Sequence, residues 1–239
     1  MRVASDEGGA TVKLSIVVPL FNEGESLGEL YAELRKVLDA LEGSWEIVFV
    51  DDGSTDTTSR LLSALREKDS RVHVAGFAAN RGLSAALSEG FSASRGRIVI
   101  SMDGDLQFDP ADILHLLEAL DSADVVCGRR ELRKDGLLKR GFSSLAYVAR
   151  SVVLGDRIHD AGCTFRAYRR GCVANLALQP GHHRFLPYIL QQSGFHVIEM
   201  PVSHRPRRYG RSKFGLARLF DGCATLLSLR FRNDEPPGR

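Results

Sequence analysis

Short runs rich in valine and isoleucine alternate with helical patterns over the first 130 residues, and this alternation constrains the fold more than any other feature. Five β-rich runs carry it, at residues 13–22, 45–53, 71–78, 97–103 and 123–130. The segments between them place apolar residues at helical spacing, at residues 25–41, 54–69, 82–94 and 109–123. Continuously apolar strands that alternate with helices predict an α/β fold whose mostly parallel sheet is covered on both faces.

The pattern changes after residue 130. Four further elements are expected: a basic, partly helical stretch at 137–154, a helix around 183–192, a strand at 195–202 and a helix at 215–231. A disordered lead-in at 1–13 and a disordered tail at 232–239 leave one domain over residues 14–231. The composition, 44% hydrophobic and 26% charged, is that of a soluble globular protein. No apolar stretch reaches the roughly 18 residues that span a bilayer.

Polar residues collect where the predicted strands end. They follow four of the five strands, at residues 19–23, 51–52, 103–105 and 129–130. In parallel sheets the carboxyl ends of the strands share one edge, and ligands bind beyond that edge. The sequence therefore predicts a functional site there.

Two aspartates, Asp103 and Asp105, stand on either side of a glycine at the end of the fourth run. Such residues can cap the helix that follows, but their mutual repulsion is also resolved by a hard divalent cation such as Mg²⁺ or Mn²⁺. Gln107 offers a neutral oxygen as a further ligand. Neither a GxGxxG turn after the first strand nor a GxxxxGK[ST] motif is present. A metal held by carboxylates is the alternative means of holding a diphosphate.

The net charge of +2 conceals two halves of opposite sign. Residues 1–124 carry 22 acidic and 11 basic residues, whereas residues 125–239 carry 8 acidic and 21 basic residues. The bases form two clusters: Arg129, Arg130, Arg133, Lys134, Lys139 and Arg140, and then Arg205, Arg207, Arg208, Arg211 and Lys213. A solvated basic face would explain them, but so would an anionic partner. Nucleic acid is disfavoured, because aromatic residues do not interleave with these bases.

Histidine and cysteine give no sign of a second site. The four cysteines form no CxxC pair and have no zinc spacing, so buried thiols in a reducing cytoplasm are expected. His182 and His183 could act as a base or as metal ligands, but a structural role at the start of a helix is favoured.

Four motifs carry a resemblance to a known family: SIVVPLFNEGESL, VDDGSTD, NRGLSAAL and MDGDLQFDP. Together and in this order they resemble the core of glycosyltransferase family 2, which has the Rossmann-like GT-A fold. Within the family the chain resembles the dolichol-phosphate and polyprenyl-phosphate sugar transferases. The resemblance implies one GT-A domain over 14–231, with a nucleotide-sugar half at 14–130 and a basic acceptor half at 131–231.

The resemblance also implies roles for individual residues. Those expected to bind the nucleotide sugar are Pro19, Phe21, Glu23, Asp51, Asp52, Asp103, Asp105, Arg207 and Lys213. Those expected to hold Mg²⁺ or Mn²⁺ are Asp103, Asp105 and Gln107, and those expected at the acceptor phosphate are Arg130, Arg140 and Ser144. Asp105, Arg130 and Arg207 are the expected catalytic residues.

Three residues depart from the family pattern in this resemblance. Gly104 replaces an alanine that is more usual between the two aspartates, a change expected to leave the site undisturbed. Asp160 matches a further element of the family, but Cys163 and Thr164 do not match the residues that follow in it.

The lack of acidic residues in one stretch of the sequence bears on which acceptor is expected. A hydroxyl acceptor needs a general base, and family 2 enzymes usually place an acidic pair near the region that is PGHHRFLPYIL here, which has no acid. A lipid phosphate is already an anion and needs cations instead. We therefore expect transfer of a sugar, with inversion, from a nucleotide sugar to a polyprenyl or dolichyl phosphate. GDP-mannose is the favoured donor and UDP-glucose the second; a transferase acting on a glycan hydroxyl and an inactive binding module are the alternatives.

The helix at 215–231 carries an apolar stripe with arginines beside it. It can pack on the core, or it can lie on anionic lipid as a basic amphipathic helix. The second possibility predicts a peripheral protein on the cytoplasmic face of a membrane, with a separate membrane-embedded partner as a further possibility.

Overall fold

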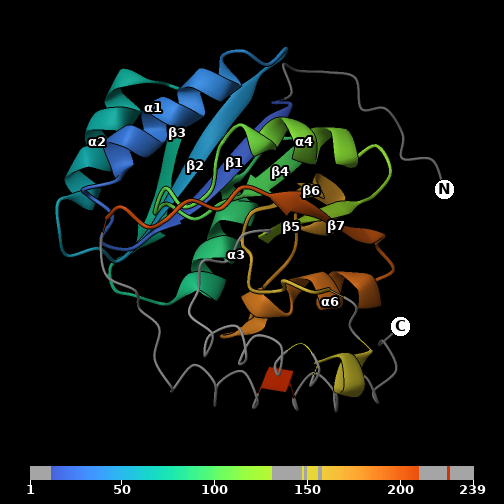
Figure 1. Ribbon diagram of the computed structural model, residues 1–239. Helices are drawn as coiled ribbons and strands as arrows, with labels where there is room; N and C mark the ends of the chain where they lie inside the picture. The colour runs from blue at the N-terminus through green and yellow to red at the C-terminus, as the bar shows by residue number, and fades with distance from the viewer. Residues whose placement is uncertain (1–11, 131–146, 148–149, 156–157, 210–224, 227–239) are drawn as a thin grey trace.

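The computed structural model describes residues 12–130, 147, 150–155, 158–209 and 225–226 (Figure 1). Several sequence-based expectations therefore fall outside the described residues. These are the lead-in up to residue 11, the tail at 232–239, and most of the stretches at 137–154 and 215–231. Residues 147, 150–154, 225 and 226 of those stretches are described, and they are helical as expected.

A seven-stranded sheet forms the centre of the molecule. Its strands are β1 (Leu14–Leu20), β2 (Trp45–Asp52), β3 (Val72–Phe77), β4 (Ile98–Ser101), β5 (Val125–Arg130), β6 (Arg166–Arg169) and β7 (Val197–Val202). The spatial order is β3-β2-β1-β4-β6-β5-β7. β6 is antiparallel to both of its neighbours, and the other strands run parallel to one another. The predicted mostly parallel sheet is confirmed.

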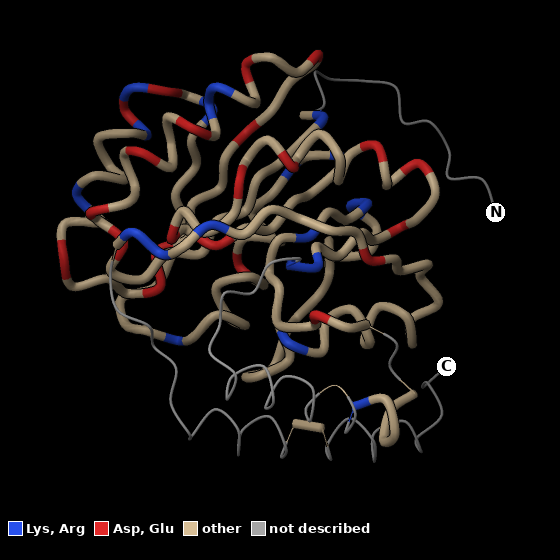
Figure 2. The backbone as a smooth tube through the Cα atoms, viewed as in Figure 1, with Lys and Arg blue, Asp and Glu red and all other residues tan. Residues whose placement is uncertain are grey.

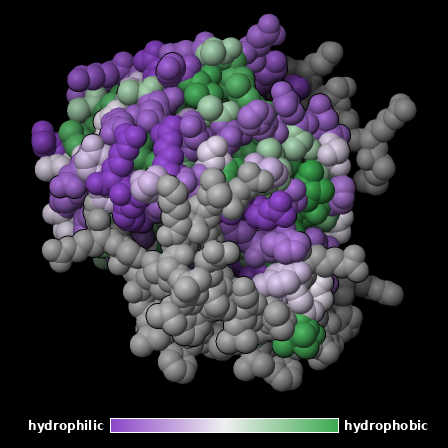
Figure 3. Space-filling view, viewed as in Figure 1, coloured by the Kyte–Doolittle hydropathy of each residue, from purple (hydrophilic) through white to green (hydrophobic). Residues whose placement is uncertain are grey.

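Helices cover both faces of this sheet. They are α1 (Leu27–Leu38), α2 (Thr58–Lys68), α3 (Leu83–Ala93), α4 (Asp112–Ala119) and α6 (Leu186–Gln192), with 3₁₀ turns η1 (Arg170–Cys172) and η2 (His182–Arg184). α1, α2 and α4 lie on one side of the sheet, and α3 and α6 lie on the other (Figure 1). The outward surface over α1 and α2 is mostly hydrophilic (Figure 3), as amphipathic helices require.

The alternation of side chains along each strand produces two cores. On β1, Ile16 and Val18 are buried with α1 and α4 in one cluster, whereas Val17 is buried with α3 in the other. Because both faces of the central strands are buried, β1 and β4 are apolar at nearly every position, which is why the sequence signal for them was strong.

β6 was not predicted from the sequence. It is a four-residue strand inserted between β4 and β5, and it lies in a basic segment where no alternation with helices was evident. Its pairing depends on β4, which lies more than 60 residues earlier in the chain, so no local pattern could indicate it.

No helix within the described residues is long and apolar enough to cross a membrane.

A buried glutamate ties the amino ends of the strands together. Glu46 on β2 is 1% exposed. Its carboxylate accepts hydrogen bonds from the Ser15 hydroxyl (2.6 Å), the Arg95 main-chain N–H (2.7 Å) and the Arg95 Nε (2.8 Å). Burial raises the pKa of Glu46, but the hydrogen bonds from Ser15 and Arg95 outweigh it and hold the pKa below its ordinary value.

We predict that Glu46→Gln lowers the free energy of unfolding by about 1–3 kcal/mol at pH 7, because the charge-assisted hydrogen bonds are lost. The stabilisation from an ionised Glu46 is present above its unfolded-state pKa and is lost as the pH falls through the lower folded-state value. Urea unfolding between pH 7 and pH 3 should therefore show the difference between wild type and variant shrinking in acid.

Glu118→Gln, on the exposed side of α4, is the matched control and should unfold like the wild type. A Glu46→Gln difference that stays constant with pH would show that ionisation of Glu46 does not stabilise the fold.

Candidate active site

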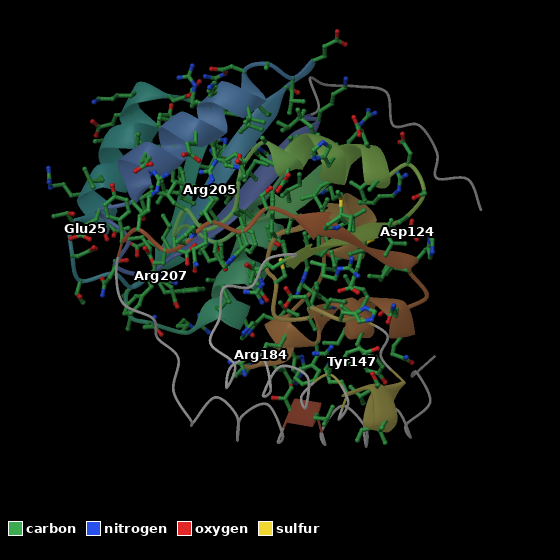
Figure 4. The ribbon with its side chains drawn as sticks, viewed as in Figure 1. Glu25, Asp124, Tyr147, Arg184, Arg205 and Arg207 are labelled. Atoms are coloured by element: carbon green, nitrogen blue, oxygen red, sulfur yellow. The ribbon has the colours of Figure 1, made fainter. Side chains whose placement is uncertain are left out.

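The predicted strand ends lie along one edge of the sheet. β1, β2 and β4 are adjacent and parallel, so the residues that follow them come together, and β5 ends on the same edge beyond β6. Figure 4 shows the segment after β7, with Arg205 and Arg207, crossing the sheet on this side. The ends of these strands are the basis of the candidate site.

The loop after β4 presents Asp105 and Gln107 through an unusual backbone. Leu106 between them has a φ of +61°, in the left-handed region that non-glycine residues seldom adopt, while its side chain is buried. The main-chain N–H of Gln107 donates to Oδ1 of Asp105 (3.1 Å). Backbone strain of this kind is concentrated at functional sites.

Gly104 fits closely in this loop. A Cβ at this position would lie 2.2 Å from Cδ2 of Leu20, so the Leu20 side chain fills the space that an alanine would use. The Gly104 carbonyl accepts a hydrogen bond from the Ser26 hydroxyl (2.9 Å) at the start of α1.

Asp103 is crowded by burial and by its neighbour. Desolvation and the charge of Asp105 raise the pKa of Asp103 to about 6, while Thr164, Arg130 and Arg166 act in the opposite direction. The two aspartates therefore repel each other unless a cation compensates their charge, as the sequence predicted.

Arg207 supplies a cation to this pair. Its Nη2 lies 2.6 Å from Oδ2 of Asp105 and 3.4 Å from Oε1 of Gln107. Arg207 belongs to residues 203–209, here called the strap, which leaves β7 and crosses the carboxyl edge of the sheet toward α1 (Figures 1 and 4).

Acidic residues hold the strap along its length. The Arg205 N–H donates to the Gln107 carbonyl (2.7 Å), and its guanidinium pairs with Glu33 (2.7 Å) and Asp109 (2.6 Å). Arg208 pairs with Glu29 of α1 (2.6 Å). Figure 2 shows basic positions crossing the molecule here with acidic positions beside them. These pairs fix the place of Arg207.

Arg130, at the end of β5, is a fixed cation. Its Nε and Nη2 both lie 2.7 Å from the carboxylate of Asp160. Its charge also lowers the pKa of Asp103. Arg130 therefore lies within electrostatic reach of Asp103.

Cys163 lies in the turn after Asp160. Burial, together with the charge of Asp160, raises the pKa of the Cys163 thiol to about 12, which keeps it protonated.

Asp51 and Asp52, at the end of β2, organise the loops beside the site. Asp51 accepts hydrogen bonds from the Ser54 N–H (2.9 Å) and from the Ser59 hydroxyl. Asp52 accepts bonds from the main-chain N–H groups of Arg81 (2.7 Å) and Gly82 (2.9 Å). The carboxylate of Asp52 thus anchors the loop that begins α3, a contact that the sequence did not indicate.

Pro19, Phe21 and Glu23 lie at and beyond the end of β1, as expected from their positions. Asn22 between the last two has a φ of +57°, and its Oδ1 accepts the Thr55 N–H (2.8 Å). A cavity of about 580 Å³ adjoins this turn, lined by Asn22, Glu23, Glu25, Thr55, Asp56, Thr57 and Tyr209.

Some expected site residues cannot be placed. Arg140, Ser144 and Lys213 lie outside the described residues. His183 is placed: its Nδ1 lies 2.8 Å from the Ser84 hydroxyl at the start of α3, which fits the structural role expected for this histidine pair.

Sequence reasoning missed Arg166. It lies on β6, is 1% exposed, and donates to the carbonyls of Ala161 (2.6 Å) and His183 (3.1 Å). Its charge lowers the pKa of Asp103. The position of Arg166 between Phe165 and Ala167 could have indicated it, because an arginine among apolar residues is seldom buried unless polar partners hold it.

The donor set suits a divalent cation that is shared with a substrate. Among the described residues, no three Asp, Glu, His or Cys side chains gather closely enough to hold a metal by themselves. Asp103, Asp105 and Gln107 offer two carboxylates and one amide. Mg²⁺ is commonly bound by one or two carboxylates together with substrate phosphates, so these residues fit such an ion.

Comparison with known proteins places the chain among transferases. A model of glycosyl transferase family 2 matches residues 15–176. The dodecaprenyl-phosphate galacturonate synthase of Rhizobium johnstonii is 35% identical over 231 residues, which cover 92% of this chain and 67% of that protein. The undecaprenyl-phosphate 4-deoxy-4-formamido-L-arabinose transferase of Pseudomonas paraeruginosa is 38% identical over 225 residues, which cover 91% and 66%. The chain spans about two thirds of the length of these relatives.

Solved structures agree on the fold. Glucosyl-3-phosphoglycerate synthase from Mycobacterium tuberculosis, in complex with Mn²⁺, UDP and glucosyl-3-phosphoglycerate, matches with a TM-score of 0.67 at 20% identity, over 95% of this chain and 82% of that one. The mannosyltransferase PcManGT from Pyrobaculum calidifontis, with GDP-Man and Mn²⁺, matches with a TM-score of 0.64 at 18% identity, over 95% and 65%. The predicted GT-A fold is confirmed. The family model and the relatives agree with the core motifs and the sheet, and this chain therefore belongs to glycosyl transferase family 2.

Proposed function

We propose that the protein transfers a sugar from a nucleotide diphosphate sugar to a polyprenyl phosphate. The observation that carries the proposal is the aspartate pair: Arg207 contacts Asp105, and the charges of Arg130 and Arg166 act on Asp103. Two relatives that are 35% and 38% identical to this chain over the aligned residues act on dodecaprenyl or undecaprenyl phosphate by name, which supports the same class of acceptor here.

The reaction is a direct displacement at the anomeric carbon. An oxygen of the acceptor phosphate forms a bond to C1 of the sugar, the bond from C1 to the donor diphosphate breaks, and its electron pair leaves with the diphosphate. The configuration at C1 inverts. No proton has to be removed, because the attacking phosphate oxygen is already ionised at neutral pH.

The residues divide into a donor group and an acceptor group. Asp105, with Asp103 and Gln107, would hold a Mg²⁺ or Mn²⁺ ion, which neutralises the charge that develops on the departing diphosphate. Arg207 and Lys213 would bind that diphosphate, and Pro19, Phe21, Glu23, Asp51 and Asp52 would form the nucleoside pocket. Arg130, Arg140 and Ser144 would bind the acceptor phosphate.

The comparison with relatives changes the expected donor sugar. GDP-mannose was the first of two expected donors, but the sugars named for the relatives are a galacturonate and a 4-deoxy-4-formamido-L-arabinose. A UDP-linked sugar, the second sequence-based expectation, is now the nearer candidate. The first experiment should therefore vary both the nucleotide and the sugar of the donor.

Two competing functions are less well supported. A transferase for a glycan hydroxyl needs a carboxylate base near η2 and α6, and residues 180–192 contain no acid. An inactive binding module would not need the Asp105–Arg207 pair over the site. Transfer to a lipid phosphate implies work at a membrane surface, and we place the protein peripherally on the cytoplasmic face.

We predict that the protein with Mn²⁺ transfers label from a nucleotide sugar to undecaprenyl phosphate in detergent. The panel comprises UDP-glucose, UDP-galacturonate, UDP-linked formamido-arabinose and GDP-mannose, and the product is measured in the organic phase. At least one UDP-sugar should give a lipid product that mild acid cleaves. The proposal fails if no donor gives lipid product while the same donors are transferred to a glycan.

Asp105→Asn should reduce kcat by about 100-fold or more, because an amide cannot supply the charge that holds the cation at the diphosphate. Asp121→Asn, in the exposed turn after α4, is the matched control and should keep full activity. Steady-state kinetics with saturating donor measure both. Full activity of Asp105→Asn would remove Asp105 from the metal site.

Arg207 and a metal ion compete for the same oxygens, because Arg207 contacts both Asp105 and Gln107. Arg207→Gln should therefore bind Mn²⁺ without nucleotide up to about tenfold more tightly than the wild type, which corresponds to about 1.4 kcal/mol. The free Mn²⁺ signal in electron paramagnetic resonance measures this.

Arg208→Gln is the matched control on the same strap, since Arg208 pairs with Glu29 instead. If Arg207→Gln and the wild type bind Mn²⁺ equally, Arg207 does not occupy the cation position.

A further inference from the structure

We infer that Glu199 on β7 is a positioning residue for Arg130. Glu199 touches neither Arg130 nor the aspartate pair in any described contact; it acts through Asp160 and the chain that carries it. The inference deepens the proposed function, on which it rests for the statement that Arg130 faces the acceptor phosphate.

The Arg130–Asp160 pair has a fixed, side-on geometry. Nε and Nη2 of Arg130 each lie 2.7 Å from one carboxylate oxygen of Asp160, and the Arg130 main-chain N–H adds a third bond (3.2 Å). The side chains are 18% and 9% exposed, so water screens the pair weakly. This arrangement uses one edge of the guanidinium, and no hydrogen bond among the described residues uses the two N–H groups of Nη1, which suit another anion.

Asp160 is itself held by Glu199. Oε1 of Glu199 accepts the Asp160 main-chain N–H (2.9 Å), and Oε2 accepts the His159 main-chain N–H (2.9 Å). Nδ1 of His159 also lies 2.9 Å from Oε2. One carboxylate therefore fixes two consecutive peptide groups, and with them the direction in which the Asp160 side chain leaves the backbone.

The Glu199 side chain is largely buried. The Glu199 side chain is 10% exposed, and the His159 ring beside it stacks on Tyr147 with ring centroids 4.9 Å apart. Replacement by water is therefore hindered, and loss of the carboxylate leaves two main-chain donors without their partner.

The position of Arg130 depends on Asp160 because a second carboxylate, that of Asp103, also attracts the guanidinium. Arg130 interacts electrostatically with Asp103 as well as with Asp160. If Asp160 moves, the guanidinium is free to turn toward Asp103, and Nη1 is no longer presented to the acceptor. Glu199 thereby decides which of the two carboxylates holds Arg130.

The first test observes Arg130 directly by NMR of protein labelled with ¹⁵N-arginine. The Nε–H signal of Arg130, identified by its loss in Arg130→Lys, should exchange slowly with solvent because it is bonded to Asp160. Glu199→Ala should speed this exchange about tenfold or more, and Glu199→Gln, which keeps one acceptor oxygen, should lie between. Asp124→Asn is the matched control, since Asp124 accepts the His196 N–H at the opposite end of the same strands (Figure 4).

The second test separates positioning from a general structural role. Glu199→Gln should raise KM for undecaprenyl phosphate by about 3- to 10-fold, equivalent to about 0.7–1.4 kcal/mol, with KM for the nucleotide sugar unchanged. A rise in both KM values by the same factor would contradict the inference.

The outcomes also separate this inference from the proposed function. An unchanged Arg130 signal in both Glu199 variants overturns the inference, whatever the protein transfers. A changed signal in a wild type that transfers no sugar to lipid phosphate overturns the proposed function and leaves the positioning role in place. If Glu199→Ala does not fold, Glu199→Gln carries both tests.

Discussion

Two carboxylates in the loop after β4 are the constraint on which the rest of the site depends. Asp103 and Asp105 repel each other, and burial raises the cost, as the elevated pKa of Asp103 reflects. Charges of one sign persist in such a place only where other groups compensate them. Three arginines supply that compensation, and each comes from a segment remote from the loop after β4.

The fold brings each arginine in by a different route. Arg130 arrives at the end of a strand of the sheet, Arg166 arrives on the inserted strand β6, and Arg207 arrives on the strap. Arg130 and Arg166 are held by other partners, Asp160 and main-chain carbonyls respectively. Arg207 contacts Asp105 and Gln107 themselves, so it is the cation that an incoming metal would have to move. The site thus combines two fixed charges with one exchangeable charge.

Much of this was predictable, and the exceptions have a physical cause. Apolar runs predicted the strands and the polar residues at their ends. The motifs pointed to Asp103, Asp105 and Arg207, and the structure places Arg207 in contact with Asp105. β6 could not be predicted, because a four-residue strand depends on partners far away in the chain. The anchoring role of Asp52 and the Glu199–Asp160 contact were missed for the same reason, since each joins a strand to a loop that is distant in sequence.

The most direct test of the account is the location of Mn²⁺ by anomalous X-ray scattering in crystals grown with Mn²⁺ and UDP. The account predicts an anomalous peak between the Asp105 carboxylate and the diphosphate, with the Arg207 guanidinium turned from Asp105 to the phosphates. A bound diphosphate with Arg207 still paired to Asp105 and no peak beside that carboxylate would contradict it.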